Sequence, residues 1–238
     1  GVRFLGVQAL NEAGFCVASV DYRLCTKDGR VTIRECVIDC MDALRYLAKN
    51  AAKLSLDANH VFTIGDSAGG HLAQMVLLSP SASFPGDPAL ADAEFRLVAG
   101  VSWYGPCDFE KSALFRRPDG TGDAERFMNR LLRGEEGAEE KLATIRELSP
   151  VNYLKADMPP LLMLQGDQDP TIPVHHARYM KKRAEAVKAP VEVVIIENAS
   201  HGWKGIDGKP HPDLDEVIGK TVGFMQRHME PEPAKPSP

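Results

Sequence analysis

Three features are scarce in this sequence, and each scarcity disfavours a class of function. Positive charge is not in excess: 28 Lys and Arg stand against 33 Asp and Glu, for a net charge of −5, which disfavours a nucleic-acid partner. No apolar run approaches the roughly 20 residues that cross a bilayer, so we expect no membrane partner. The five cysteines lack metal-ligand spacing, so we expect neither a metal nor another cofactor.

The residues that bind metals elsewhere have plainer interpretations here. The cysteines stand at positions 16, 25, 36, 40 and 107. Cys36 and Cys40 lie four residues apart on a predicted helix, and we expect small buried apolar side chains rather than a disulfide or metal site. The pair His175-His176 has no carboxylate or cysteine at ligand spacing, so we predict a solvated helix start there.

The sequence is long and apolar enough for one α/β domain, with 238 residues of which 44% are hydrophobic,. Short β-rich runs alternate with amphipathic helical stretches, which favours a mostly parallel sheet covered by helices on both faces. The predicted strands are 15–20, 61–64, 97–103, 160–165 and 191–196, and the predicted helices include 37–47, 177–187 and 214–224.

We predict that this domain spans residues 1–229, with an insertion at 108–148 over the carboxyl edge of the sheet. The insertion is rich in Arg, Glu and Gly, with helical pieces at 124–132 and 139–148. It fits either a cap over a substrate pocket or a solvated pair of connecting helices. Residues 230–238 are rich in proline and are expected to form a disordered tail.

The most informative motif is Gly65-Asp66-Ser67-Ala68-Gly69-Gly70, a G-x-S-x-G sequence between a predicted strand and a predicted helix. A sharp turn of this kind holds a serine in a strained conformation with its hydroxyl exposed. Ser67 is therefore the candidate nucleophile. The helix that follows directs free N–H groups to the same point, so the N–H of Ala68 is the candidate oxyanion donor.

Two further loops complete the constellation of a serine hydrolase. The loop after strand 160–165 carries Asp167 and Asp169, and the loop after strand 191–196 carries His201. Serine, acid and histidine then follow one another in the chain order of the α/β-hydrolase triad. The two residues that flank the turn, Asp66 and His71, are interpreted as structural.

Four motifs together resemble the esterase/lipase branch of the α/β-hydrolases, and most closely its acetyl-xylan and feruloyl esterase-like carboxylesterases. They are residues 65–71, Asp21-Tyr22-Arg23-Leu24, Trp103-Tyr104-Gly105-Pro106, and Gly166 to Pro173. The resemblance covers residues 5–228. It favours Asp169 over Asp167 as the acid, because Gly166, Asp169 and Pro173 match the family's Gly-x-x-Asp-x-x-Val-Pro pattern.

The resemblance implies a serine carboxylesterase with the triad Ser67, Asp169 and His201, acting on small-molecule or polysaccharide-linked esters such as acetyl or feruloyl groups. Trp103, Tyr104 and Trp203 are candidate walls of the substrate pocket, with aromatic core packing as the alternative. Related functions stay open: a prolyl-oligopeptidase-like peptidase, an aryl formamidase, or a hydrolase-fold binding protein without catalysis.

One departure from the family pattern sets a further expectation. Members carry a His-Gly-Gly-Gly-type loop after the third strand, which supplies the second oxyanion donor, and this sequence contains no such loop. In the family's strand order the third strand would lie between 15–20 and 61–64. We therefore expect a gap at that place in the sheet and a chain that is part of a longer protein. The sequence leaves oligomeric state and localisation open.

Overall fold

The centre of the molecule is a sheet of four parallel strands in the order β1-β2-β3-β4. The computed structural model describes residues 6–117, 119–134 and 136–229. The strands are β1 (Val61–Asp66), β2 (Leu97–Trp103), β3 (Leu161–Gly166) and β4 (Val191–Ile196). The two inner strands, β2 and β3, are almost wholly buried, whereas β1 and β4 are largely half-buried. Four of the five predicted strands are thus confirmed.

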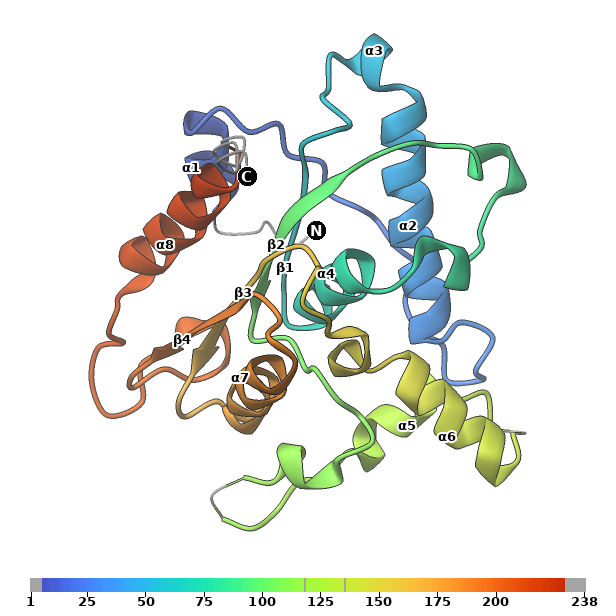
Figure 1. Cartoon of the computed structure of the whole chain (residues 1–238). Helices are drawn as coiled ribbons and strands as arrows, with labels where there is room; N and C mark the ends of the chain where they lie inside the picture. Colours follow the sequence, from blue (N-terminus) through green and yellow to red (C-terminus); the bar gives the residue numbers. More distant parts are fainter. Residues whose placement is uncertain (1–5, 118, 135, 230–238) are drawn as a thin grey trace, which may run out of the picture.

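Helices cover both faces of this sheet (Figure 1). The α-helices are α1 (Val7–Glu12), α2 (Ile33–Lys49), α3 (Ala51–Leu54), α4 (Ala68–Leu78), α5 (Glu125–Leu131), α6 (Ala138–Glu147), α7 (His175–Val187) and α8 (Leu214–Arg227). Short 3₁₀ turns are η1 (Ser81–Ser83), η2 (Pro88–Leu90), η3 (Ser112–Phe115), η4 (Pro150–Tyr153) and η5 (His201–Trp203). Helices α1 and α8 lie against one face, and α4 and α7 against the other, with α2 packed on α4.

The alternation of side chains along β3 explains why both faces need a cover. Leu162 and Leu164 join the apolar cluster under α8, whereas Leu161 and Met163 join the cluster under α4 and α7. Successive residues of a strand point to opposite faces, so a strand that is apolar at every position must be buried on both.

Two of the covering helices begin at reciprocal caps that the sequence encodes. At α2 the Thr32 side chain accepts a backbone hydrogen bond while Glu35 accepts one from the Thr32 N–H, and Asp213 and Glu216 do the same at α8. Each arrangement satisfies N–H groups that have no partner within the helix.

The predicted strand 15–20 is absent. Residues 16–25 make no backbone–backbone hydrogen bond with any described residue, although the ring of Phe15 packs edge-on against that of Phe62, with centroids 5.5 Å apart. The apolar pattern of residues 15–20 therefore corresponds to an extended segment beside β1 and not to a strand. A strand also requires a hydrogen-bonding neighbour, and among the described residues β1 pairs with β2 alone.

The segment predicted as an insertion, 108–148, is partly core and partly surface among its described residues. Phe115 and Leu131 are buried in the cluster that includes α2 and α4, while α6 has no buried residue. Two of its arginines reach the loop after β3: Arg117 donates to the carbonyl of Pro170 at 2.9 Å, and Arg126 donates to that of Thr171. The predicted tail, 230–238, lies outside the described residues.

His71 and His176 are both buried, and the burial of His176 contradicts the predicted solvated start of the helix at His175-His176. His175 is exposed, but His176 is fully buried, because it starts the inner face of α7 that continues with Met180 and Ala184. Its Nδ1 accepts the backbone N–H of Cys107 at 3.2 Å. Burial lowers the pKa of His176 to about 3 and that of His71 to about 4.

These buried histidines predict how stability depends on pH. Because their pKa values in the folded protein are below the unfolded value of ~6.5, the unfolded chain binds protons first as the pH falls. The free energy of unfolding should therefore decrease below about pH 6.5, by roughly 1.4 kcal/mol per pH unit for each histidine. Urea unfolding at pH 7.5, 6 and 5 measures this slope. His176→Gln should reduce it by about half, and His175→Gln should not; equal slopes in both variants would contradict the prediction.

Candidate active site

The serine turn joins β1 to α4 and holds Ser67 in an unfavourable backbone conformation, with φ 52° and ψ −115°. Its N–H donates to the carbonyl of Trp103 at 2.9 Å, and its own carbonyl accepts the N–H of His71 at 3.1 Å. Positive φ at a non-glycine residue costs free energy and persists only where surrounding contacts impose it. These two hydrogen bonds are part of what imposes it.

Close backbone contacts, possible only with glycine, set the position of α4. A Cβ atom on Gly65 would lie 2.3 Å from the carbonyl oxygen of Gly69, and one on Gly70 would lie 2.7 Å from that of Trp103. A Cβ atom on Gly105 would likewise lie 2.5 Å from the carbonyl carbon of Gly70. A Cβ atom on Gly69 would have no neighbour closer than 4.0 Å, so the position on the helix side that requires glycine is 70 and not 69.

The three residues predicted as a triad form one hydrogen-bonded chain. His201 Nε2 lies 2.9 Å from Ser67 Oγ, and His201 Nδ1 lies 2.7 Å from Asp169 Oδ2. The carboxylate accepts the Nδ1 proton, which leaves Nε2 free to accept the serine proton. Each residue follows the carboxyl end of a different strand: Ser67 follows β1, Asp169 follows β3 and His201 follows β4.

The carboxylate of Asp169 is completely buried and fully hydrogen-bonded. Its Oδ1 accepts the backbone N–H groups of Thr171 and Ile172 at 2.7 and 2.9 Å. Its Oδ2 accepts from Gln165 Nε2 at 3.2 Å in addition to His201. These bonds compensate for burying the charge. Asp167 has a different position, because its Oδ1 accepts the backbone N–H of Ala199 at 3.2 Å.

Ala68 is the first residue of α4 and is exposed. The first N–H of a helix has no acceptor within the helix, and it lies at the positive end of the helix dipole. The position predicted for an oxyanion donor therefore has a free backbone N–H and directly follows the serine, at the start of α4.

The three aromatic residues predicted to wall a pocket form one cluster of edge-on and tilted ring contacts, and all three are buried. Tyr104 lies nearest the triad, with its ring centroid 4.6 Å from that of His201 and 4.7 Å from that of Trp203. Trp103 is only 1% exposed and donates from Nε1 to Thr221 Oγ1 on α8. The Trp103 ring therefore packs between Trp203 and helix α8. Its contact with the serine turn is made by its backbone carbonyl, which accepts the Ser67 N–H.

The residues that flank the turn make the structural contacts expected of them. Asp66 Oδ2 accepts the hydroxyl of Tyr104 at 3.3 Å. His71 is buried, and its Nε2 donates to the carbonyl of Leu148 at 2.8 Å, which ties α4 to the end of the insertion.

Sequence reasoning missed one residue of the site, Gln165. It ends the otherwise apolar run of β3, is fully buried, and donates from Nε2 both to Asp169 Oδ2 and to the carbonyl of Ile172 at 2.8 Å. The sequence did contain a signal for it, because Gln165 is a polar residue at the end of an apolar strand and lies four positions before the acid.

Other sites are less evident. Within the described ranges no group of three or more His, Cys, Asp or Glu could hold a metal ion, and no described helix is long and apolar enough to span a bilayer. All five cysteines are free thiols, with Cys36 buried and Cys40 half-buried.

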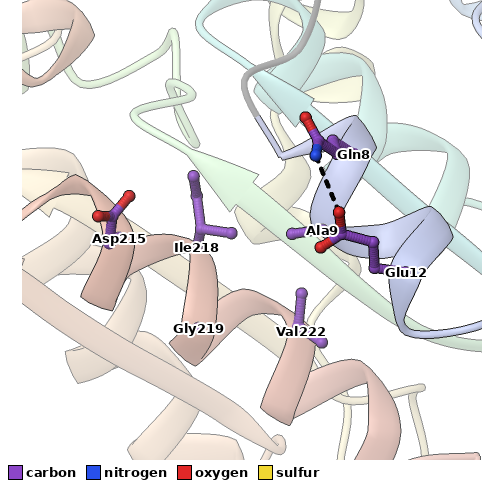
Figure 2. Close-up of a pocket in the computed structure, with 7 residues that line it drawn as sticks. All are labelled: Gln8, Ala9, Glu12, Asp215, Ile218, Gly219 and Val222. Atoms are coloured by element: carbon purple, nitrogen blue, oxygen red, sulfur yellow. Dashed lines mark hydrogen bonds between the residues drawn. The ribbon is translucent and has the colours of Figure 1, made fainter.

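A groove between α1 and α8 shares no residue with the triad (Figure 2). It is lined by Gln8, Ala9, Glu12, Asp215, Ile218, Gly219 and Val222.

The parallel sheet, its helical covers and the serine turn define a protein with the α/β-hydrolase fold. More particularly, the family described as BD-FAE matches residues 3–184, and the chain belongs to this family.

Curated relatives of similar sequence carry esterase names. The chain is 27% identical to "Probable carboxylic ester hydrolase LipM" of Mycobacterium tuberculosis over 94% of this chain and 51% of the relative. It is also 27% identical to "Isoprenylcysteine alpha-carbonyl methylesterase ICME" of Arabidopsis thaliana, over 93% of this chain and 51% of the relative. The chain thus spans about half the length of the curated relatives it matches.

Solved structures share the fold. A truncated form of a carbohydrate esterase from gut microbiota superposes with a TM-score of 0.71 at 22% identity, over 92% of this chain and 76% of the other. Esterase 2 of Thermogutta terrifontis with propionate bound gives a TM-score of 0.66 at 23% identity, over 90% and 72%.

The contacts of the turn predict a contrast between two neighbouring glycines. Gly70→Ala should lower the free energy of unfolding by about 1–3 kcal/mol, because the new methyl meets backbone atoms that cannot yield,. Gly69→Ala has room and should be neutral or stabilising by up to about 1 kcal/mol, since alanine favours a helix. Urea denaturation compares the two proteins, and equal stability would show that the packing at Gly70 is not tight.

Proposed function

We propose that this chain carries the catalytic serine, histidine and aspartate of a carboxylic ester hydrolase. The observation that supports it most strongly is the continuous hydrogen-bonded chain from Ser67 through His201 to Asp169. Family membership and the esterase names of the relatives support the same chemistry.

In the proposed mechanism His201 is the general base. Its Nε2 takes the proton of Ser67 as the oxygen attacks the ester carbonyl, and it later returns that proton to the leaving alcohol. Asp169 holds the imidazole through Nδ1 and stabilises its charged form. A water molecule then repeats the sequence against the acyl-enzyme, with the leaving proton delivered to Ser67.

The negative charge of the tetrahedral intermediate is proposed to meet the N–H of Ala68. Removing a donor of this kind costs about 10²–10³ in rate in other hydrolases. Tyr104 and Trp203 are proposed to contact the substrate beside the imidazole, since their rings pack together and Tyr104 also packs on His201. Trp103 contributes through its carbonyl.

As substrates we propose esters of short acyl groups, with acetyl or feruloyl esters of plant polysaccharide as the natural examples. Structural neighbours support this range, because one is described as a carbohydrate esterase and another is described with propionate and with butyrate bound. The insertion at 108–148 is proposed to act as a cap, because Arg117 and Arg126 attach it to the acid loop.

Substitution of the triad tests the mechanism. Ser67→Ala, His201→Ala and Asp169→Asn should each lower kcat by about 10⁴-fold or more on p-nitrophenyl acetate, because the three residues act as a unit. A fluorophosphonate should label the unaltered protein at Ser67, as read by peptide mass spectrometry, and should not label Ser67→Ala.

Asp167→Asn is the matched control, since this carboxylate accepts a backbone N–H instead of the imidazole. It should retain most of the activity. A dead Asp167→Asn protein beside an active Asp169→Asn protein would transfer the acid role. A folded protein that neither hydrolyses esters nor reacts with the fluorophosphonate would favour a hydrolase-fold binding protein.

Acyl-chain preference tests the proposed substrate class. The aromatic side chains Phe115 and Phe127 of the insertion pack into or against the core instead of forming an apolar lid. Acetate and butyrate esters of p-nitrophenol should therefore have kcat/KM values at least about tenfold above that of the decanoate. Faster hydrolysis of the decanoate would contradict a short acyl pocket.

A further inference from the structure

Two cysteine thiols that the proposed function does not use lie in contact. Cys25 Sγ and Cys36 Sγ are 3.8 Å apart, whereas a disulfide bond measures about 2.05 Å. Cys25 is half-buried, in the segment before α2, and Cys36 is buried within α2. The sulfurs come together because a turn, closed by the Thr26 N–H to Val31 carbonyl bond of 2.9 Å, returns the chain to the start of α2.

The two partners differ in how firmly they are held. Cys36 follows the capped start of α2, and its Sγ lies 3.1 Å from the carbonyl of Arg23 and 3.3 Å from that of Thr32, so its S–H can donate to either. Cys25 lies outside any helix or strand and reaches the surface. A small movement of the Cys25 side chain is thus what bond formation requires.

A bond at this place would add a covalent link to a segment that is held by side-chain contacts instead of backbone pairing. Residues 16–25 make no backbone–backbone hydrogen bond with described residues. Its polar contacts with α2 involve Arg23 and Asp39: the guanidinium donates from both Nε and Nη2 to the carboxylate, and the Arg23 N–H donates to Asp39 Oδ2 at 2.8 Å.

We propose that Cys25 and Cys36 are a reversible disulfide site, which when oxidised fixes the end of the extended segment 15–25 to helix α2. The proposal is independent of the ester hydrolase function, since neither cysteine belongs to the triad or its supporting loops. The modification is a disulfide bond between two thiols that the fold already places in contact.

The oxidant is a low-molecular-weight disulfide such as oxidised glutathione. Cys25 loses a proton and attacks one glutathione sulfur, which expels one glutathione thiolate and forms a mixed disulfide. Cys36 then loses its proton and attacks the Cys25 sulfur, which expels the second glutathione. Two protein thiols are oxidised and one glutathione disulfide is reduced to two thiols. Cys36 is buried and Cys25 reaches the surface, so Cys25 meets the oxidant first,; burial also raises the pKa of the Cys36 thiol.

The experiment uses the protein with Cys16→Ser, which removes the exposed thiol that would otherwise react with glutathione. The protein is equilibrated with oxidised glutathione or with dithiothreitol, free thiols are alkylated, and peptides are analysed by mass spectrometry. We expect a peptide pair linked through Cys25 and Cys36, and a Tm about 5 °C or more above that of the reduced protein, because the bond restricts the unfolded chain.

Cys25→Ser in the same background should lose both the link and the difference in Tm, and this half-buried position tolerates the change better than Cys36. Cys40→Ser, one turn further along α2, is the matched control and should keep both. The proposal is overturned if no Cys25–Cys36 link forms, if the main link uses Cys40, or if Cys25→Ser shows the same Tm difference as its parent.

Discussion

Close approach of α4 to the ends of β1 and β2 is the constraint on which the rest of the site depends. Gly65, Gly70 and Gly105 let backbone meet backbone at distances that any Cβ would prevent. That approach allows the Ser67 N–H to bond the last carbonyl of β2 and holds the serine at positive φ. The strain is local, and it accompanies a serine at the carboxyl edge of the sheet whose hydroxyl lies 2.9 Å from His201 Nε2,.

The other half of the site solves an electrostatic problem. A buried carboxylate is costly unless it is hydrogen-bonded, and Asp169 has two backbone N–H groups, Gln165 and the imidazole as donors. The same bonds fix the direction from which His201 approaches. The hydrogen bonds that compensate for burying the Asp169 carboxylate therefore also orient it. The carboxylate in turn orients the imidazole of His201.

The motifs at the ends of strands were predictable from the sequence. Which segments pair as strands, and how deeply a given side chain is buried, were not. The residues of the proposed triad could be named because each follows an apolar strand, and β2 and β4 were predicted at their observed bounds. Phe15–Val20 looked like a strand because its apolar pattern fits an extended chain, but hydrogen bonding to a neighbour is a non-local property. His176 was misjudged for a related reason: the direction of a helix face depends on what it packs against, here Cys107.

The predicted insertion, 108–148, is hydrogen-bonded at both of its ends to the loops and helix that carry the proposed catalytic residues. Arg117 and Arg126 donate to the carbonyls of Pro170 and Thr171, and Thr171 also donates its N–H to Asp169. At its other end, Leu148 accepts a hydrogen bond from His71 on the serine helix. Each contact joins a side chain of one partner to a backbone carbonyl of the other. The attachment to the acid loop therefore depends on the arginine side chains of the insertion, whereas the attachment to the serine helix depends on His71 and uses a carbonyl that any residue at position 148 would supply,.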